Sequence, residues 1–143
     1  MISISFEGQV HRTLTPKWSY APLSGAGAAR QGGRANRQGV EALYTSLDEH
    51  TALREYQQPS PLMPPGTLIT ISVRLSSVID FRARYVQGEW DPLWQDFFCD
   101  WRELRFNQYV EPPSWVVADI AMQQAKGLLF PSMAHHGGTS PAR

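Results

Sequence analysis

A stretch with no apolar periodicity, residues 21–40, constrains the fold of this chain more than any other feature. It contains one proline and five glycines, at Pro22, Gly25, Gly27, Gly32, Gly33 and Gly39. Glycine and proline at this density interrupt regular helices and strands. A structureless stretch of this length inside a domain of 143 residues is typical of a functional segment, so we expect a long functional loop here.

Regular elements are expected on both sides of this loop, because apolar residues recur there at helical or strand spacing. The expected strands are residues 2–6, 9–14, 42–47 and 67–75, a continuation over 78–81, and residues 128–133. The expected helices are residues 49–57, 93–106 and 114–126. Asp48 is expected to cap the first helix, which Pro59 and Pro61 end, and Ser114 to cap the last, with Gly127 just after its end.

The order of these elements indicates the fold class. Strands and helices do not alternate as βαβ units, so we expect an α+β fold rather than a doubly wound sheet. Hydrophobic residues make up 42% of the chain and charged residues 18%, which is ordinary globular composition. No internal repeat or domain boundary is visible, and residues 1–143 are therefore expected to form a single domain.

Several partner classes are disfavoured by the bulk properties. The formal net charge is zero and no basic helix is present, so we expect no direct binding to nucleic acid or to an anionic membrane. The N-terminal sequence lacks a basic start and a long apolar run, which argues against a secretory signal. The single Cys99 excludes an intramolecular disulfide and fits a reducing compartment. These features together predict a cytoplasmic protein.

The distribution of charge carries more information than its sum. Residues 11–40 contain five cations and no acid, whereas residues 80–111 contain seven acids and four arginines. Arginine outnumbers lysine eleven to two, and guanidinium groups suit bidentate recognition of phosphate or carboxylate. The pattern suggests an anion site in the first half of the chain.

Two apparent motifs fail on inspection. The segment 25–30 resembles a dinucleotide fingerprint, but Arg30 occupies the third glycine position and no hydrophobic strand precedes it. The histidines have no specific ligand spacing, so no metal site is expected from His11, His50, His135 and His136 with Cys99. Four tryptophans on acidic segments are interpreted as core or partner-facing residues: Trp90, Trp94, Trp101 and Trp115.

The informative cluster runs from residue 32 to residue 55. Gly32 and Gly33 permit a close backbone approach to a ligand, which Arg34 could then contact through a phosphate. Tyr44 could offer a ring face for stacking, and Glu55 lies at the apolar edge of the expected helix. Singly, each of these residues is more often structural, but their order and spacing together favour a binding site.

The same elements resemble those of the RES-domain family, which is named for an arginine, a glutamate and a serine. The matching segments are residues 10–12 (VHR), 22–25 (PLSG), 32–36 (GGRAN), 42–46 (ALYTS), 52–55 (ALRE) and 127–132 (GLLFPS). The named arginine falls on Arg12, the glutamate on Glu55 and the serine on Ser132. Ala35 departs from the pattern, because the family usually has tryptophan there. The chain also ends soon after Ser132, so we expect either a truncated C-terminus or a sheet closed differently.

The resemblance implies a toxin of a bacterial toxin–antitoxin pair that acts on NAD. It implies a fold like that of ADP-ribosyltransferases, with a split β-sheet and flanking helices. The implied catalytic residues are Glu55, Arg34, Tyr44 and Ser132. The implied NAD-binding residues are Arg12, Gly33, Arg34, Tyr44 and Ser46, with no metal.

Cleavage of the bond between nicotinamide and ribose develops oxocarbenium character, which a carboxylate can stabilise. The resemblance implies an antitoxin partner of the helix-turn-helix class. The acceptor stays open between water, phosphate and a protein side chain. A rival interpretation is a non-enzymatic module whose arginine-rich loop binds a nucleotide or an acidic peptide.

Overall fold

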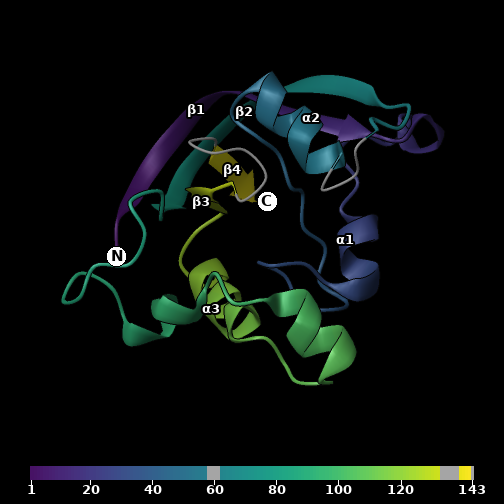
Figure 1. Ribbon diagram of the computed structural model, residues 1–143. Helices are drawn as coiled ribbons and strands as arrows, with labels where there is room; N and C mark the ends of the chain where they lie inside the picture. The colour runs from purple at the N-terminus through teal and green to yellow at the C-terminus, as the bar shows by residue number, and fades with distance from the viewer. Residues whose placement is uncertain (58–61, 133–138, 143) are drawn as a thin grey trace.

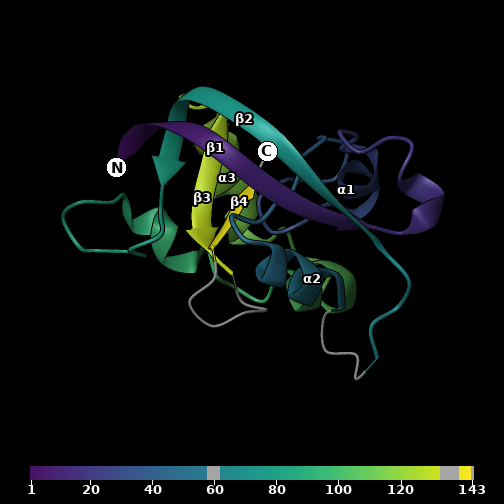
Figure 2. The same cartoon turned by 90° about the horizontal axis from the view of Figure 1, so that it is seen from above.

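The computed structural model describes residues 1–57, 62–132 and 139–142, and these form one mixed sheet with helices and turns packed around it. The strands lie in the order β1 (Ser3–Leu14), β2 (Thr67–Asp80), β3 (Gly127–Pro131) and β4 (Thr139–Ala142). Figures 1 and 2 show β1 and β2 as a long curved ribbon, with β3 and β4 beside one part of it. The α+β class expected from the sequence is confirmed.

The sheet consists of two hairpin-like halves. β1 and β2 pair antiparallel along almost their whole length, from Ser3–Ile79 to Leu14–Thr67. β3 joins β2 in parallel through three residue pairs, between Val78–Asp80 and Gly127–Leu129. The described strands therefore form a single sheet of two halves. The split expected for the sheet corresponds to the place where only three residue pairs join β2 and β3.

The two long strands form because apolar residues alternate with polar ones. In β2 the side chains of Ile69, Ile71, Val73 and Leu75 are half-buried, while the intervening residues are exposed. The strand expected over 67–75 and its continuation form one element, as do the strands expected over 2–6 and 9–14. A register shift between Ile4 and Phe6 accommodates the irregularity in β1.

Two helices form near their expected positions. α2 (Glu49–Gln57) begins as expected, because the Asp48 carboxylate accepts hydrogen bonds from the backbone N–H and the hydroxyl of Thr51, at 2.7 and 2.8 Å. α3 (Pro113–Met122) starts one residue early and ends four residues before the expected end. Two cap expectations at α3 are wrong: Pro112 occupies the N-cap position, and Gly127 opens β3 instead of following the helix.

Two further expectations for local structure are wrong. The loop over 21–40 contains a short helix, α1 (Ala26–Gln31), because three alanines favour helix between the flanking glycines. Residues 93–106 form no continuous helix, but a 3₁₀ turn (Pro92–Asp96) and a π turn (Glu103–Asn107). The carbonyls of Phe97 and Cys99, between those turns, both accept from the Arg34 side chain. The Cys99 carbonyl also accepts from the Trp101 N–H at 2.9 Å, two residues further on and not at the helical spacing of four.

The strand expected over 42–47 is also not formed as a strand. Its residues make isolated bridges, of which the one between Ser46 and His11 has two backbone hydrogen bonds of 2.7 Å. β1 is paired along its length with β2, and the segment forms an isolated bridge to β1 at Ser46 rather than a further long strand. β4, by contrast, was not expected from the sequence, and it pairs antiparallel with β3.

An aromatic core lies against one side of the sheet. Phe81 is at its centre, with ring centroids of Trp90, Trp94 and Phe97 at 4.8, 4.7 and 5.5 Å. The helix α3 closes the core with Val117, Ala118 and Ala121. The four tryptophans interpreted as core or partner-facing are all at most 8% exposed, so they are buried. Trp90 and Trp94 belong to this core cluster. Within the described ranges, no helix has the length and apolarity that crossing a membrane would require.

Candidate active site

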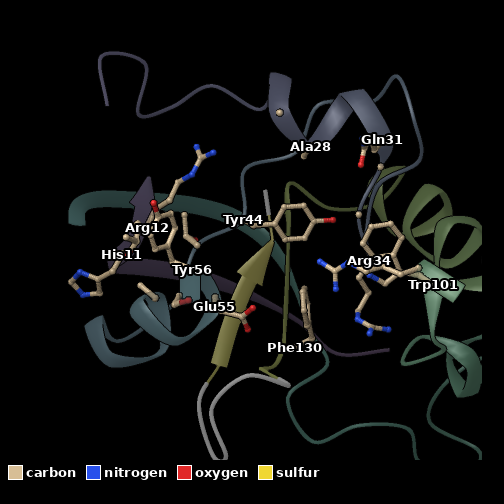
Figure 3. Close-up of a pocket in the computed structure, with 18 of the residues that line it drawn as sticks. His11, Arg12, Ala28, Gln31, Arg34, Tyr44, Glu55, Tyr56, Trp101 and Phe130 are labelled. Carbon is tan, nitrogen blue, oxygen red and sulfur yellow. The ribbon is translucent and has the colours of Figure 1, made fainter. Parts of the chain in front are cut away.

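A cavity of about 660 Å³ lies between β1, α1, α2 and the turn after Cys99. Figure 3 shows its labelled side chains, with Glu55 and Tyr44 near the centre and Arg34 toward Trp101. Six of the site residues named from the sequence line it: Arg12, Gly33, Arg34, Tyr44, Ser46 and Glu55. The seventh, Ser132, reaches the cavity through Glu55, to which it is hydrogen-bonded.

Glu55 and Ser132 come together from opposite parts of the chain. Glu55 lies in the second half of α2, whose buried residues Thr51 and Ala52 fix the helix against the domain. Ser132 follows β3 directly and is 7% exposed. The Ser132 hydroxyl donates a short hydrogen bond to Oε1 of Glu55. The contact restrains one carboxylate oxygen of a side chain that opens onto the cavity.

Arg34 is held by backbone carbonyls of the aromatic half. Its Nη1 donates to the carbonyl oxygens of Phe97 and Cys99, at 2.9 and 2.8 Å, and its guanidinium lies 5.5 Å from the Phe98 ring centroid. Burial lowers the pKa of Arg34 from its ordinary value, but arginine stays protonated at neutral pH. Within the described residues, no partner is found for Nε and Nη2, so these donors can serve a ligand.

The turn that carries Arg34 requires two glycines. Gly32 has φ of +85°, and a Cβ there would lie 2.6 Å from the Trp115 ring. A Cβ on Gly33 would lie 2.7 Å from the Tyr44 hydroxyl oxygen, and the Gly33 carbonyl accepts from the Trp115 indole N–H at 2.7 Å. The close backbone approach expected at these glycines is made to the protein's own aromatic side chains.

Tyr44 and Asn36 connect this turn to the rest of the loop. The Tyr44 hydroxyl donates to Oδ1 of Asn36 at 2.7 Å and accepts from the backbone N–H of Ala35 at 2.8 Å. Nδ2 of Asn36, which is 1% exposed, donates to the carbonyls of Ala28 and Val40 at 2.9 and 2.7 Å. Tyr44 therefore has a structural role besides lining the cavity. The Ala35 methyl group lies in the core, at the position where the family usually has tryptophan.

Arg12 anchors the loop on the other side of the cavity. Its Nη1 donates to the carbonyl oxygens of Pro22 and Ser24, both at 3.0 Å. Burial lowers its pKa from the ordinary value, though not enough to remove its charge at neutral pH. Ser46 is fixed next to it by the backbone bridge to His11, whose ring nitrogen Nδ1 lies 2.9 Å from Oγ1 of Thr70.

Several lining or supporting residues were not assigned from the sequence. Asn36 and Trp115 hold the Arg34 turn, and the far end of the cavity is lined by Trp101, Arg102 and Phe106. Asn36 is the last residue of the GGRAN segment that matches the family pattern, so the sequence contained a signal for it. Trp101 and Phe106 gave no such signal, because the sequence does not distinguish an aromatic residue in a core from one in a cavity wall.

The described part of the chain holds no group of three or more His, Cys, Asp or Glu side chains arranged to bind a metal ion. Of the histidines weighed as ligands, His135 and His136 lie outside the described residues. The cavity lining supplies a restrained carboxylate, guanidinium groups and aromatic rings. Such a combination fits an anionic ligand that carries a ring.

The chain belongs to the RES domain family, whose model matches residues 9–140. Its fold is similar to that of a chain in the crystal structure of the M. tuberculosis MbcT–MbcA toxin–antitoxin complex, with a TM-score of 0.60 and 15% identity. That match covers 98% of this chain and 75% of the other. Among proteins with curated function, none matches. The family resemblance of the sequence is thus confirmed, and the structural likeness concerns the fold.

Proposed function

We propose that this protein is the toxin of a bacterial toxin–antitoxin pair and that it consumes NAD by cleaving the bond between nicotinamide and ribose. The main observation behind the proposal is the Glu55 carboxylate, which Ser132 restrains by a hydrogen bond. The cavity around it is also lined by two half-buried arginines, Arg12 and Arg34. The cavity volume falls within the roughly 300–1,000 Å³ typical of small-molecule sites. Membership of the RES domain family supports the choice of NAD.

In the proposed reaction, the bond between C1′ of the ribose and the nicotinamide nitrogen breaks, and its electron pair leaves with nicotinamide. Positive charge then develops on the ribose, and the Glu55 carboxylate stabilises it. Ser132 keeps one carboxylate oxygen oriented through its hydrogen bond. A nucleophile adds to C1′ and loses its proton; water, phosphate or a protein side chain would each complete the balance.

The phosphates of NAD are assigned to the arginines. Arg12 and Arg34 each use Nη1 to bind backbone carbonyls, which fixes the guanidinium planes before a ligand arrives. Their remaining N–H groups can donate to phosphate oxygens, and charge-assisted hydrogen bonds of this kind are among the stronger ones. Gly33 and Ser46 line the same cavity and are proposed to contact the ligand, while Tyr44 offers its ring to nicotinamide.

An antitoxin of the helix-turn-helix class is proposed as the protein partner. The structural neighbour was crystallised as a toxin–antitoxin complex, which supports the existence of a partner for a chain of this fold. We expect the partner to cover the cavity or insert a segment into it, so the complex should not consume NAD. A complex that consumes NAD as fast as the free protein would contradict this mode of inhibition.

The proposal is tested by incubating the purified protein with NAD and identifying the products by mass spectrometry, with and without phosphate and cell extract. Release of nicotinamide together with ADP-ribose, its phosphorylated form or an ADP-ribosylated protein would support it and would also identify the acceptor. Binding of NAD without release of nicotinamide under all of these conditions would instead favour the non-enzymatic binding module.

A further inference from the structure

One end of the cavity combines charge and aromatic surface in a way that the proposed roles do not use. Arg102, Trp101 and Phe106 line the cavity there, next to Arg34. The Arg102 guanidinium lies 4.9 Å from the Trp101 ring centroid, and the Trp101 and Phe106 centroids are 5.9 Å apart. Figure 3 shows Trp101 beyond Arg34 when viewed from Glu55.

Arg102 is a cation placed beside another cation. Burial lowers the pKa of Arg34, and the positive charge of Arg102 acts in the same direction, so the two guanidiniums lie within range of each other's charge. The Arg102 side chain is exposed and, within the described residues, its guanidinium forms no ion pair and no hydrogen bond. The negative charge of Asp100 acts on Arg34 in the opposite direction and offsets part of this repulsion. Asp100 does not line the cavity, so an anion bound inside it can contact both guanidinium groups.

The aromatic residues beside this pair differ in exposure, which defines what they can contact. Trp101 is 8% exposed and forms the fixed base of the wall, whereas Phe106 is 38% exposed and belongs to the π turn Glu103–Asn107. Short π segments of this kind frequently occur at functional sites. An exposed ring at a cavity edge can stack with a nucleobase, and stacking is worth about 1–3 kcal/mol per base.

We infer that this end of the cavity binds the ADP half of the dinucleotide, with Arg102 and Arg34 on the phosphate next to the adenosine and Phe106 beside the base. The inference rests on the proposed function for the identity of the substrate, and it adds the orientation of the bound dinucleotide. The adenosine lies beyond Arg34, and the second phosphate, on the side of Arg12, directs the nicotinamide ribose toward Glu55. Arg102 is thus a substrate-binding residue of the cavity.

The test uses ADP, which carries both recognised groups and needs no turnover to be measured. Arg102→Gln should weaken ADP binding about five- to tenfold by titration calorimetry, since an exposed charge contributes less than a buried one. Arg54→Gln is the control, because Arg54 is an exposed arginine on α2 that does not line the cavity. Its ADP affinity should equal that of the parent protein.

A second arm separates the base from the phosphates. Phe106→Ala should weaken binding of ADP and leave binding of inorganic pyrophosphate unchanged. Unaltered ADP affinity in a folded Arg102→Gln protein, or no ADP binding by the parent protein, would overturn the inference. If ADP binds as expected but NAD is never consumed, the proposed function fails while the assignment of this end to a nucleoside diphosphate stands.

Discussion

The two walls of the cavity are built by segments of opposite character. The basic segment, residues 12–46, buries few apolar side chains, namely Leu14, Ala35 and Ala42, and is held by hydrogen bonds to backbone groups. The aromatic segment, residues 81–130, buries a cluster of large rings centred on Phe81. Arg34 connects the two, since it belongs to the first segment and binds carbonyls of the second.

The difference indicates how stability and function are divided. Burial of aromatic rings is strong but tolerates small shifts, because it is not directional. Hydrogen bonds with distances of 2.7–2.9 Å, as around Asn36 and Tyr44, fix atoms in position but each add little net stability. Substitutions in the aromatic segment should therefore change stability most, and those in the basic segment should change activity most.

The largest effect on stability is expected at Phe81, which is 1% exposed and contacts Trp90, Trp94 and Phe97. Phe81→Ala should lower the free energy of unfolding by about 3–5 kcal/mol, measured by urea denaturation. The milder Phe81→Leu keeps the domain folded for assay, and its NAD consumption per folded molecule should stay close to that of the parent. A large loss of activity in a folded Phe81→Leu protein would contradict the assignment of stability to the aromatic segment and activity to the basic segment.

A smaller loss of stability with a larger loss of activity is expected at Asn36. Asn36→Ala removes the donor to the half-buried carbonyls of Ala28 and Val40, although Ala28 still accepts from the Gly32 N–H at 2.9 Å, and it removes the acceptor of the Tyr44 hydroxyl. The loss should cost about 1–3 kcal/mol in urea denaturation. The turn that carries Arg34 should then shift, and NAD consumption should fall on the order of 10- to 100-fold. Gln38→Ala, in the same loop but exposed, is the control; equal activity in both variants would contradict the positioning role.

The arginines should affect affinity for NAD most, with an additional cost in stability because each also donates to two backbone carbonyls. Arg12→Ala and Arg34→Ala should each weaken NAD binding by about 1.5–3 kcal/mol in calorimetry, the typical value for a hydrogen bond to a charged group. Arg30→Ala is the control, because Arg30 is exposed on α1 and does not line the cavity. Unchanged affinity in both cavity variants, with the fold intact, would remove the phosphate assignment.

The smallest effect is expected from the ion pair of Asp80 and Arg82, which lies at the start of the aromatic segment and away from the cavity. The hydrogen bond from Arg82 lowers the pKa of Asp80, so the charged pair stabilises the fold above the unfolded-state pKa of about 4. This contribution is lost as the pH falls through the lowered value.

Asp80→Asn should therefore cost less than about 1 kcal/mol at pH 7, and the difference from the parent should vanish in acid. Urea denaturation at several pH values measures both. The KM for NAD should not change, because neither residue lines the cavity. A difference in the free energy of unfolding that grows on acidification would contradict the expected loss of this ion pair in acid.

The sequence predicted the long elements better than the short ones, for a physical reason. β2 and α2 were predicted because alternation in one and a capping aspartate in the other are local signals. The turns over 92–107 were not predicted, because they depend on long-range contacts. The rings of Trp94 and Phe97 pack against Phe81, and the carbonyls of Phe97 and Cys99 accept from Arg34. β4 has only four residues and forms by pairing with β3, so its own sequence contains no local signal for a strand.

The candidate site shows the same limit. The juxtaposition of Glu55 with Ser132 could be expected only through the family resemblance, since 77 residues separate them. The anchoring of Arg34 on the aromatic segment could not be expected, because a loop arginine gives no sign of which carbonyls it will contact. Residues that bond to distant backbone groups are therefore found from the structure, while residue types suited to the chemistry are found from the sequence.

The central claim is that the Glu55 charge serves the chemical step. Glu55→Gln keeps the shape and can still accept from Ser132, but it removes the charge. NAD consumption should fall by roughly 10²-fold or more, while NAD affinity and the free energy of unfolding change little. Glu49→Gln, exposed on the same helix and outside the cavity, should consume NAD at the parent rate. A folded Glu55→Gln protein that matches the parent rate would contradict the account.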